Sequence, residues 1–299
     1  MKIINSFLII IFIVFCYGCK VSRINIEDLK IFAATETFPD DSYLDTVINK
    51  RALVIVAHDD DDCVMSGTIA KLNSQGWEIK QLTFTSHISD KTGKKPAEII
   101  CLGNEPILLK GNYRIGADTI KMPYIPISYH EISQQYFTKR VSDSISLKIN
   151  NFKPSVIFTL DNIKGGYGHP DHVFLSQLIL DLFNQNKIEC QRIYQGVYTD
   201  HMEQEILDKW LRPQMAKWGY PYPSDIANKI YNIDGMPEPN TQIDISLSAE
   251  IKMKYLMDYP EEARKNLRKF IPYYENFNAQ DYFAIFNREF FRVIENPNR

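Results

Sequence analysis

Two apolar runs without a charged residue constrain the fold of this 299-residue chain more than any other feature. They are ALVIVA at residues 52–57 and SVIFTL at residues 155–160. Runs of this kind are typical of strands buried on both faces, as in a parallel sheet. Segments with helical spacing follow at 63–76 and 172–186. Because strands that alternate with helices form βαβ units, we predict a Rossmann-like, three-layer α/β/α fold with a mostly parallel sheet.

The remaining elements follow from periodicity and from turn residues. We expect further strands at 78–85, 119–123 and 192–199, and an edge strand at 241–247. We expect helices over part of 105–118 and at 131–152, 251–258, 261–270 and 280–291. Residues 210–225 are rich in Pro, Trp and Tyr, and they indicate an ordered but irregular lid within an irregular C-terminal extension.

The N-terminus resembles a bacterial lipoprotein signal. An early lysine precedes an apolar run from Phe7 to Tyr17, which is shorter than the ~20 residues that a spanning helix needs and fits a secretory signal. Gly18 and Cys19 end the run as a lipobox does. We therefore expect residues 1–18 to be a signal peptide and Cys19 to be lipidated, so that the exported protein is anchored to a membrane of the cell envelope. A plain signal peptide or an uncleaved anchor is the alternative.

Composition excludes several classes of protein. Hydrophobic residues make up 44% and charged residues 24%, as in ordinary globular chains. The formal net charge of −3 gives no electrostatic reason to expect a nucleic-acid partner. The remaining cysteines stand far apart, form no disulfide framework, and are expected to be isolated, mostly buried thiols: Cys63, Cys101 and Cys190. We interpret residues 19–49 as a tether and entry segment and residues 50–299 as one domain.

A polar cluster follows each of the two apolar runs. The first is HDDDD at 58–62 and the second is YGHPDH at 167–172. The carboxyl ends of parallel strands lie on one edge of a sheet, where α/β proteins bind ligands. We therefore expect the two clusters to meet.

The residue types in these clusters predict a metal centre. Four consecutive aspartates repel one another and are expensive to bury unless a cation lies among them. His58, Asp61 and His172 offer two nitrogens and one oxygen with an open fourth position, as a catalytic zinc or related divalent ion requires. Because adjacent side chains of extended backbone point to opposite sides, Asp61 can bind the ion while Asp60 faces its water.

Together the clusters resemble the motifs of the PIG-L (LmbE-like) family of zinc-dependent de-N-acetylases. That family carries A-H-P-D-D-E after its first strand and H-x-D-H after a later one. This chain has AHDDDD at 57–62 and HPDH at 169–172, and the resemblance covers about 51–199. It implies the same fold, Zn²⁺ or another divalent metal as cofactor, and removal of an N-acyl group, above all acetyl, from an amino sugar or glycoconjugate.

The resemblance also implies residue roles. His58, Asp61 and His172 would bind the metal, and Asp60 would be the general base. His169 would stabilise the oxyanion or protonate the leaving amine, oriented by Asp171. Tyr167 matches a position where some members place a hydroxyl near the oxyanion. Many members also carry a substrate-binding arginine between the motifs, for which the candidates are Lys94, Lys95 and Arg114.

Two departures keep other functions open. Asp59 and Asp62 stand where the family has proline and glutamate. The alternative from another class is a glycan-binding surface lipoprotein with a degenerate deacetylase site. The same residues could also hydrolyse a different amide or an ester, and a two-metal phosphodiesterase is a weaker alternative. A calcium loop is disfavoured because the alternating D-x-D-x-D-G spacing is absent.

Overall fold

The computed structural model describes residues 24–85, 96–102, 107–108 and 113–295. The predicted signal peptide and the lipidation site Cys19 lie outside these ranges, as do Lys94 and Lys95. Among the described residues, no helix has the length and apolar character to cross a bilayer.

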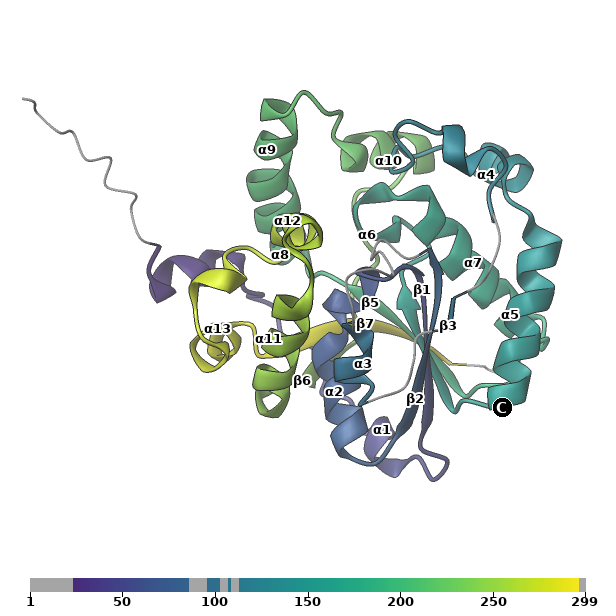
Figure 1. Cartoon of the computed structure of the whole chain (residues 1–299), viewed down its shortest axis with the longest axis horizontal. Coiled ribbons are helices and arrows are strands. Elements are labelled where there is room, and N and C mark those ends of the chain that lie inside the picture. Colours follow the sequence, from purple (N-terminus) through teal and green to yellow (C-terminus); the bar gives the residue numbers. More distant parts are fainter. Residues whose placement is uncertain (1–23, 86–95, 103–106, 109–112, 296–299) are drawn as a thin grey trace, which may run out of the picture.

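A seven-stranded sheet runs through the centre of the described chain in the order β3-β2-β1-β4-β5-β7-β6 (Figure 1). The strands are β1 (Arg51–His58), β2 (Glu78–Thr85), β3 (Ile107–Leu108), β4 (Val156–Leu160), β5 (Arg192–Val197), β6 (Thr241–Asp244) and β7 (Arg288–Glu295). The first five in the order pair in parallel, whereas β7 pairs antiparallel with both β5 and β6. The predicted mostly parallel α/β sheet is confirmed.

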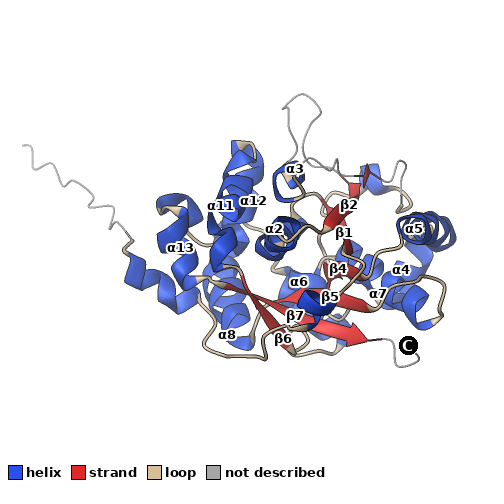
Figure 2. Cartoon of the chain, turned by 90° about the horizontal axis from the view of Figure 1, so that it is seen from below, coloured by secondary structure: helices blue, strands red, loops and turns tan. Residues whose placement is uncertain are grey.

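Helices cover both faces of this sheet (Figure 2). Those before β5 are α1 (Tyr43–Thr46), α2 (Ser66–Ser74), α3 (Ala97–Ile100), α4 (Tyr129–Gln135), α5 (Thr138–Phe152), α6 (Gly165–Gly168) and α7 (Pro170–Asn184). Those after β5 are α8 (Asp200–Met202), the π-helix η4 (Glu203–Leu211), α9 (Arg212–Lys217), α10 (Pro223–Tyr231), α11 (Ala249–Asp258), α12 (Glu261–Phe270) and α13 (Ala279–Ile285).

Strand β1 shows why the layers form. Its even-numbered residues from Ala52 to Val56 belong to an apolar cluster with residues of α2 and α11. Its odd-numbered residues from Leu53 to Ala57 belong to a second cluster with residues of α5 and α7. Because successive side chains of a strand point to opposite faces, an uninterrupted apolar run buries itself only between two helical layers.

The structure differs from three predictions of strands and helices before β4. Residues 119–123 form turns instead of a strand, because Lys121 and Met122 lie exposed at the surface instead of in a core. The segment 105–118, expected to be partly helical, contributes the short strand β3 and, at its end, the start of a 3₁₀ helix at Ala117–Thr119. The helix expected at 131–152 is two helices, α4 and α5, because the chain is extended at Tyr136, whose ring packs against Phe174.

The chain after Thr199 is more regular than the sequence predicts. Residues 210–225, expected to be irregular, are largely helical in η4, α9 and the start of α10. The helix expected at 280–291 ends at Ile285, and β7 begins at Arg288. In β7 the fully buried Phe291 pairs with Gly196 of β5 and packs against Phe158 of β4, which is a partnership that local spacing does not reveal.

The segment expected to be a tether is packed from residue 24 onwards. Leu29 is fully buried in the 3₁₀ turn η1 (Ile26–Phe32), and Asp40 pairs with Gln242 of β6. The prediction that the cysteines are buried thiols is confirmed, since Cys63, Cys101 and Cys190 are buried and form no disulfide among the described residues.

Candidate active site

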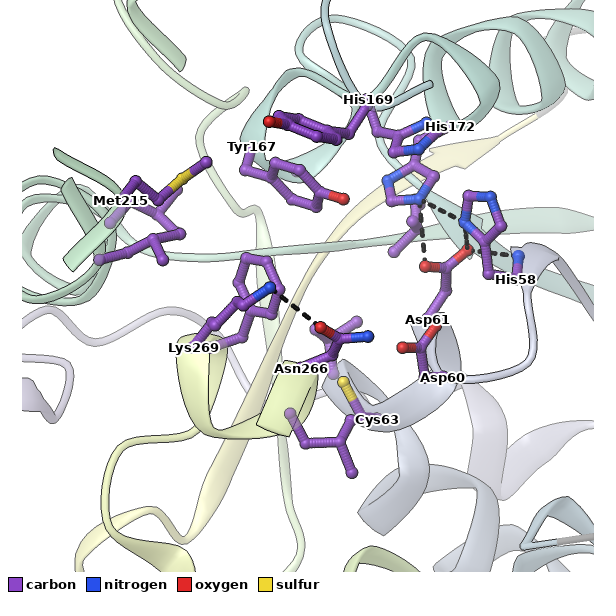
Figure 3. A pocket seen from close by; sticks show the side chains of 18 of the residues that line it. His58, Asp60, Asp61, Cys63, Tyr167, His169, His172, Met215, Asn266 and Lys269 are labelled. Atoms are coloured by element: carbon purple, nitrogen blue, oxygen red, sulfur yellow. Dashed lines mark hydrogen bonds and ion pairs between the residues drawn. The ribbon is translucent and has the colours of Figure 1, made fainter. Parts of the chain in front are cut away.

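The two motif clusters meet as expected, because β1 and β4 are adjacent parallel strands and each cluster follows the carboxyl end of one of them. His58 is the last residue of β1, Asp61 opens the next turn, and His172 lies in the first turn of α7. His58 Nδ1 is 3.1 Å from His172 Nε2 and 3.4 Å from Asp61 Oδ2, and His172 Nε2 is 3.1 Å from Asp61 Oδ1 (Figure 3).

These spacings fit a metal ion. Ligand atoms about 2.0–2.1 Å from a tetrahedral ion lie about 3.3 Å from one another. The three contacts between His58, Asp61 and His172 match that spacing. A second set is also close, since ring nitrogens of His58, His169 and His172 all lie within 4.8 Å of one another.

Hydrogen bonds favour His58, Asp61 and His172 over the three histidines as the metal ligands. His172 Nδ1 is 3.0 Å from the Gly165 carbonyl, which can only accept, so its Nε2 keeps a lone pair for a metal. His58 Nε2 is 3.3 Å from the Asp171 carboxylate, so the His58 proton lies on Nε2 and the lone pair on Nδ1 is left for a metal. Such outer partners orient metal-binding histidines in general. His169 Nδ1 instead accepts the Asp171 backbone N–H at 3.2 Å, so its lone pair is already used.

Charge within the site is balanced by mutual pairing. Burial opposes ionisation of Asp61, but the charges of His172 and His58, and their hydrogen bonds, hold the pKa of that carboxyl well below its usual range. Burial alone would lower the pKa of His58, yet the carboxylates of Asp61 and Asp171 raise it well above its usual value. Burial lowers the pKa of His169 well below its usual value, against the attraction of Asp171. A neutral His169 therefore carries its proton on Nε2.

Asp171 contacts His58 more closely than His169. Its carboxylate is 3.3 Å from His58 Nε2 and 4.0 Å from His169 Nδ1. It also accepts hydrogen bonds from the hydroxyls of Tyr113 and Tyr136. The side chain therefore orients a predicted metal ligand, and only its backbone N–H orients His169. Motif reasoning did not find the two tyrosines, and nothing in their spacing could have revealed them.

Arg114 does not reach the pocket. Its guanidinium is buried, lies 3.7 Å from Asp171 Oδ1, and donates to the side chain of Gln135 at 3.0 and 3.2 Å. Arg114 is the one candidate for a substrate-binding cation that the structure describes. Its guanidinium lies near Asp171, outside the pocket lining.

Three of the four aspartates lie in different surroundings. Asp61 lies among the histidines, and Asp60 lines the pocket. Asp62 is fully buried and accepts a hydrogen bond from Tyr255, and burial raises the pKa of Asp62 well above its usual value. The departure from the family motif at Asp62 therefore adds no carboxylate oxygen to the three-ligand set. The expected metal would offset the charge of Asp61, whereas burial disfavours the charged form of Asp62.

The loop before α7 is shaped by one carboxylate and by glycine. Asp161 accepts four backbone N–H groups, those of residues 163–166, at 2.6–3.0 Å. Gly165 has φ +66°, and a Cβ there would lie 2.8 Å from Val173 Cγ2. Only glycine suits this conformation and this close approach. The loop thereby presents the Gly165 carbonyl to His172.

A pocket of about 460 Å³ opens on these residues. The predicted residues in its wall are His58, Asp60, Asp61, Tyr167, His169 and His172. Asp171 does not line the pocket. Burial raises the pKa of Tyr167 well above its usual value, with Asp61 and Asp60 adding to the shift, so its hydroxyl stays protonated. Residues after Thr199 complete the wall, among them Asn266 and Lys269 of α12, which carry no motif that marks them in the sequence.

Several solved structures resemble this chain at low similarity. The N,N'-diacetylchitobiose deacetylase from Pyrococcus horikoshii is 18% identical, with 85% of this chain and 89% of that chain covered and a TM-score of 0.42. The A40926 pseudoaglycone deacetylase is 13% identical (83% and 98% covered, TM-score 0.45). The 4-carboxy-2-hydroxymuconate hydratase from Pseudomonas putida is 13% identical (82% and 96% covered, TM-score 0.44). Likenesses at this level carry no functional argument.

Sequence comparison is more specific. No curated protein matches the chain significantly. Residues 53–183 match the model of a protein family, PIG-L, described as GlcNAc-PI de-N-acetylase. The matched segment contains both polar clusters and the strands β1 and β4 that bring them together. Residues 53–183 therefore form a PIG-L family domain.

Proposed function

We propose that the protein is a metal-dependent hydrolase that removes an N-acyl group, acetyl first, from an amino sugar or glycoconjugate. The observation that carries the proposal is the set of 3.1–3.4 Å contacts among His58, Asp61 and His172, within a segment that matches the PIG-L model. We propose Zn²⁺ as the native ion, because two imidazoles and one carboxylate with an open position suit it.

The chain's own residues divide the work of amide hydrolysis. A bound divalent ion would supply Lewis acidity and lower the pKa of its water to about 7. Asp60, in the pocket wall beside Asp61, would take the proton from the attacking water as general base. His169, with its proton on Nε2, and the protonated hydroxyl of Tyr167 donate hydrogen bonds to the carbonyl oxygen as negative charge develops. The proton that Asp60 has taken then passes to the leaving amine, which returns the carboxylate to its ionised form. Asp171 holds His58 in place.

The test combines metal content with amine release. The chain from residue 21 onwards is analysed for bound metals, and free amine is measured with fluorescamine on N-acetylglucosamine conjugates. We expect one equivalent of zinc and release of amine. Metal without release on any N-acyl sugar would point to another amide or to an ester. Absence of metal would contradict the proposal and favour the glycan-binding lipoprotein.

Two variants separate the base from the ligands. Asp60→Asn keeps the size of the side chain but cannot accept the proton, so we expect at least ~10²-fold loss of kcat with metal content unchanged. His172→Ala removes a ligand, so we expect loss of both metal and activity. Full activity in Asp60→Asn would show that another group is the base. Zinc retained in His172→Ala would contradict the proposed ligand set, and the three-histidine set as well, because His172 belongs to both.

We also propose that Cys19 is lipidated and anchors the protein to the cell envelope. The support is the apolar run up to Tyr17 followed by Gly18-Cys19. Expression in bacteria fed an alkynyl fatty acid should label the full chain and place it in the membrane fraction. Cys19→Ser should abolish the label, while Cys63→Ser, a buried thiol in the domain, should keep it. A label that persists in Cys19→Ser would contradict the anchor.

A further inference from the structure

The wall of the pocket away from the metal site is built by helices that lie outside the segment matched by the family model. Leu207 and Leu211 of η4 and Met215 of α9 are spaced four residues apart, so they share one helix face, and that face lines the pocket. The pocket therefore has an apolar side that motif residues do not form.

Large apolar side chains are also left in solvent at this pocket. Met122, Trp218 and Tyr220 all line it and are 43%, 45% and 53% exposed. Apolar residues gathered around one opening are typical of a ligand-binding surface, because their exposure to water is unfavourable until a ligand covers them.

The pocket is polar between its two ends. In Figure 3, Asn266 and Lys269 lie between the metal-site residues and Met215. Lys269 donates a hydrogen bond to Asn266 at 2.9 Å, and its Nζ is 5.7 Å from the centre of the Trp218 ring. On the other side, the carboxylate of Asp60 partly offsets the lowering of the Lys269 pKa by burial. From the metal site towards Met215, the pocket wall is therefore first ionic, then polar at Asn266 and Lys269, and then apolar.

Resting on the function proposed above, we propose that the substrate is amphiphilic: an N-acylated amino sugar whose aglycone is an aliphatic or aromatic group. The scissile amide lies at the metal site, the sugar hydroxyls meet Asn266 and Lys269, and the aglycone fills the space between the η4–α9 face and Trp218. A long N-acyl chain fits less well, because it would run from the metal site directly into the polar middle.

The kinetic test varies the aglycone at constant acyl group. Methyl, propyl and hexyl β-glycosides of N-acetylglucosamine are compared by kcat/KM, and we expect a rise of up to about fourfold per buried methylene. In the double variant Trp218→Ala/Tyr220→Ala, we expect the hexyl-to-methyl ratio to fall about tenfold. Both side chains are about half exposed, so the fold should survive. Leu147→Ala, an exposed apolar residue of α5, is the matched control and should leave the ratio unchanged.

A binding experiment separates this proposal from the proposed activity. Hexyl and methyl β-glucoside carry no amide, so calorimetry with them reports the apolar site even if no substrate is hydrolysed. Tighter binding of the hexyl compound that is lost in the double variant would support the site whatever the activity. Equal kcat/KM for methyl and hexyl substrates, a ratio that the double variant leaves unchanged, or a length preference confined to the N-acyl side would overturn it.

Discussion

At the scale of residues, the site depends on side chains and backbone that never touch substrate. Asp161 organises the loop after β4 by accepting four N–H groups, and that loop offers the Gly165 carbonyl to His172. Asp171, held by two tyrosine hydroxyls, does the same for His58. Metal-binding histidines need such partners to fix which nitrogen keeps its lone pair.

Gly165 allows a test of this support. Gly165→Ala places a Cβ 2.8 Å from Val173 Cγ2 at φ +66°, so we expect a loss of ~2–4 kcal/mol in the free energy of unfolding, together with weaker zinc binding. Gly76→Ala is the control, because Gly76 has φ +83° with no atom within 4 Å of a new Cβ and should cost only ~1–2 kcal/mol. Both are measured by urea unfolding and zinc competition. Equal losses in the two variants would show that the close approach is unimportant.

At the scale of elements, a buried ion pair joins the loop before α7 to the π-helix that walls the pocket. Lys164 is 1% exposed and pairs with Glu203, the first residue of η4. Glu203 also accepts the backbone N–H of Met236, another residue of the pocket wall, at 2.8 Å. One ion pair, Lys164 with Glu203, therefore positions the loop before α7 relative to the helix η4 in the pocket wall.

Removing the lysine should reveal that connection. Lys164→Met leaves the Glu203 carboxylate buried without its cation, and we expect a loss of about 3–5 kcal/mol in the free energy of unfolding. Lys139→Met breaks an exposed pair with Asp143 on α5 and should cost at most about 1 kcal/mol. Adding Glu203→Gln to Lys164→Met should recover part of the loss. If Lys164→Met were as mild as the control, the pair would not hold the two elements together.

At the scale of the whole molecule, long-range hydrogen bonds hold the segments on both sides of the family match at 53–183. Strands β6 and β7 extend the sheet beyond β5, and Glu289 of β7 accepts the N–H groups of Gly67 and Thr68 at the start of α2. From the N-terminal side, Glu36 accepts the Thr199 hydroxyl at 2.8 Å and the His201 N–H at 2.7 Å.

The Glu36 contact predicts a pH dependence. Burial opposes the ionised form, but the hydrogen bonds from His201 and Thr199 outweigh it and lower the pKa of Glu36. A lowered pKa stabilises the fold above the unfolded value of about 4.3, and the gain is lost as pH falls through the folded value. Glu36→Gln should therefore be less stable than the natural chain at pH 7 and approach it below about pH 4. A stability difference that does not change with pH would contradict the assignment to Glu36 ionisation.

Much of this protein was determined by its sequence alone. The charge-free runs at 52–57 and 155–160 can be buried only as central strands, so the parallel α/β core followed from period and composition. Because parallel strands end on one edge of the sheet, it also followed that His58, Asp61 and His172 meet. These inferences succeeded because they depend on patterns within short segments.

The tertiary structure decided the rest, because it depends on partners far apart in the sequence. Strand β7 forms by pairing with β5, although its own spacing resembles a helix. Asp62 is separated from its three neighbours by burial against Tyr255, which is 193 residues away. The apolar wall of the pocket arises only where η4 and α9 fold over the catalytic rim. Long-range packing sets the environment of each side chain, and local periodicity carries no record of it.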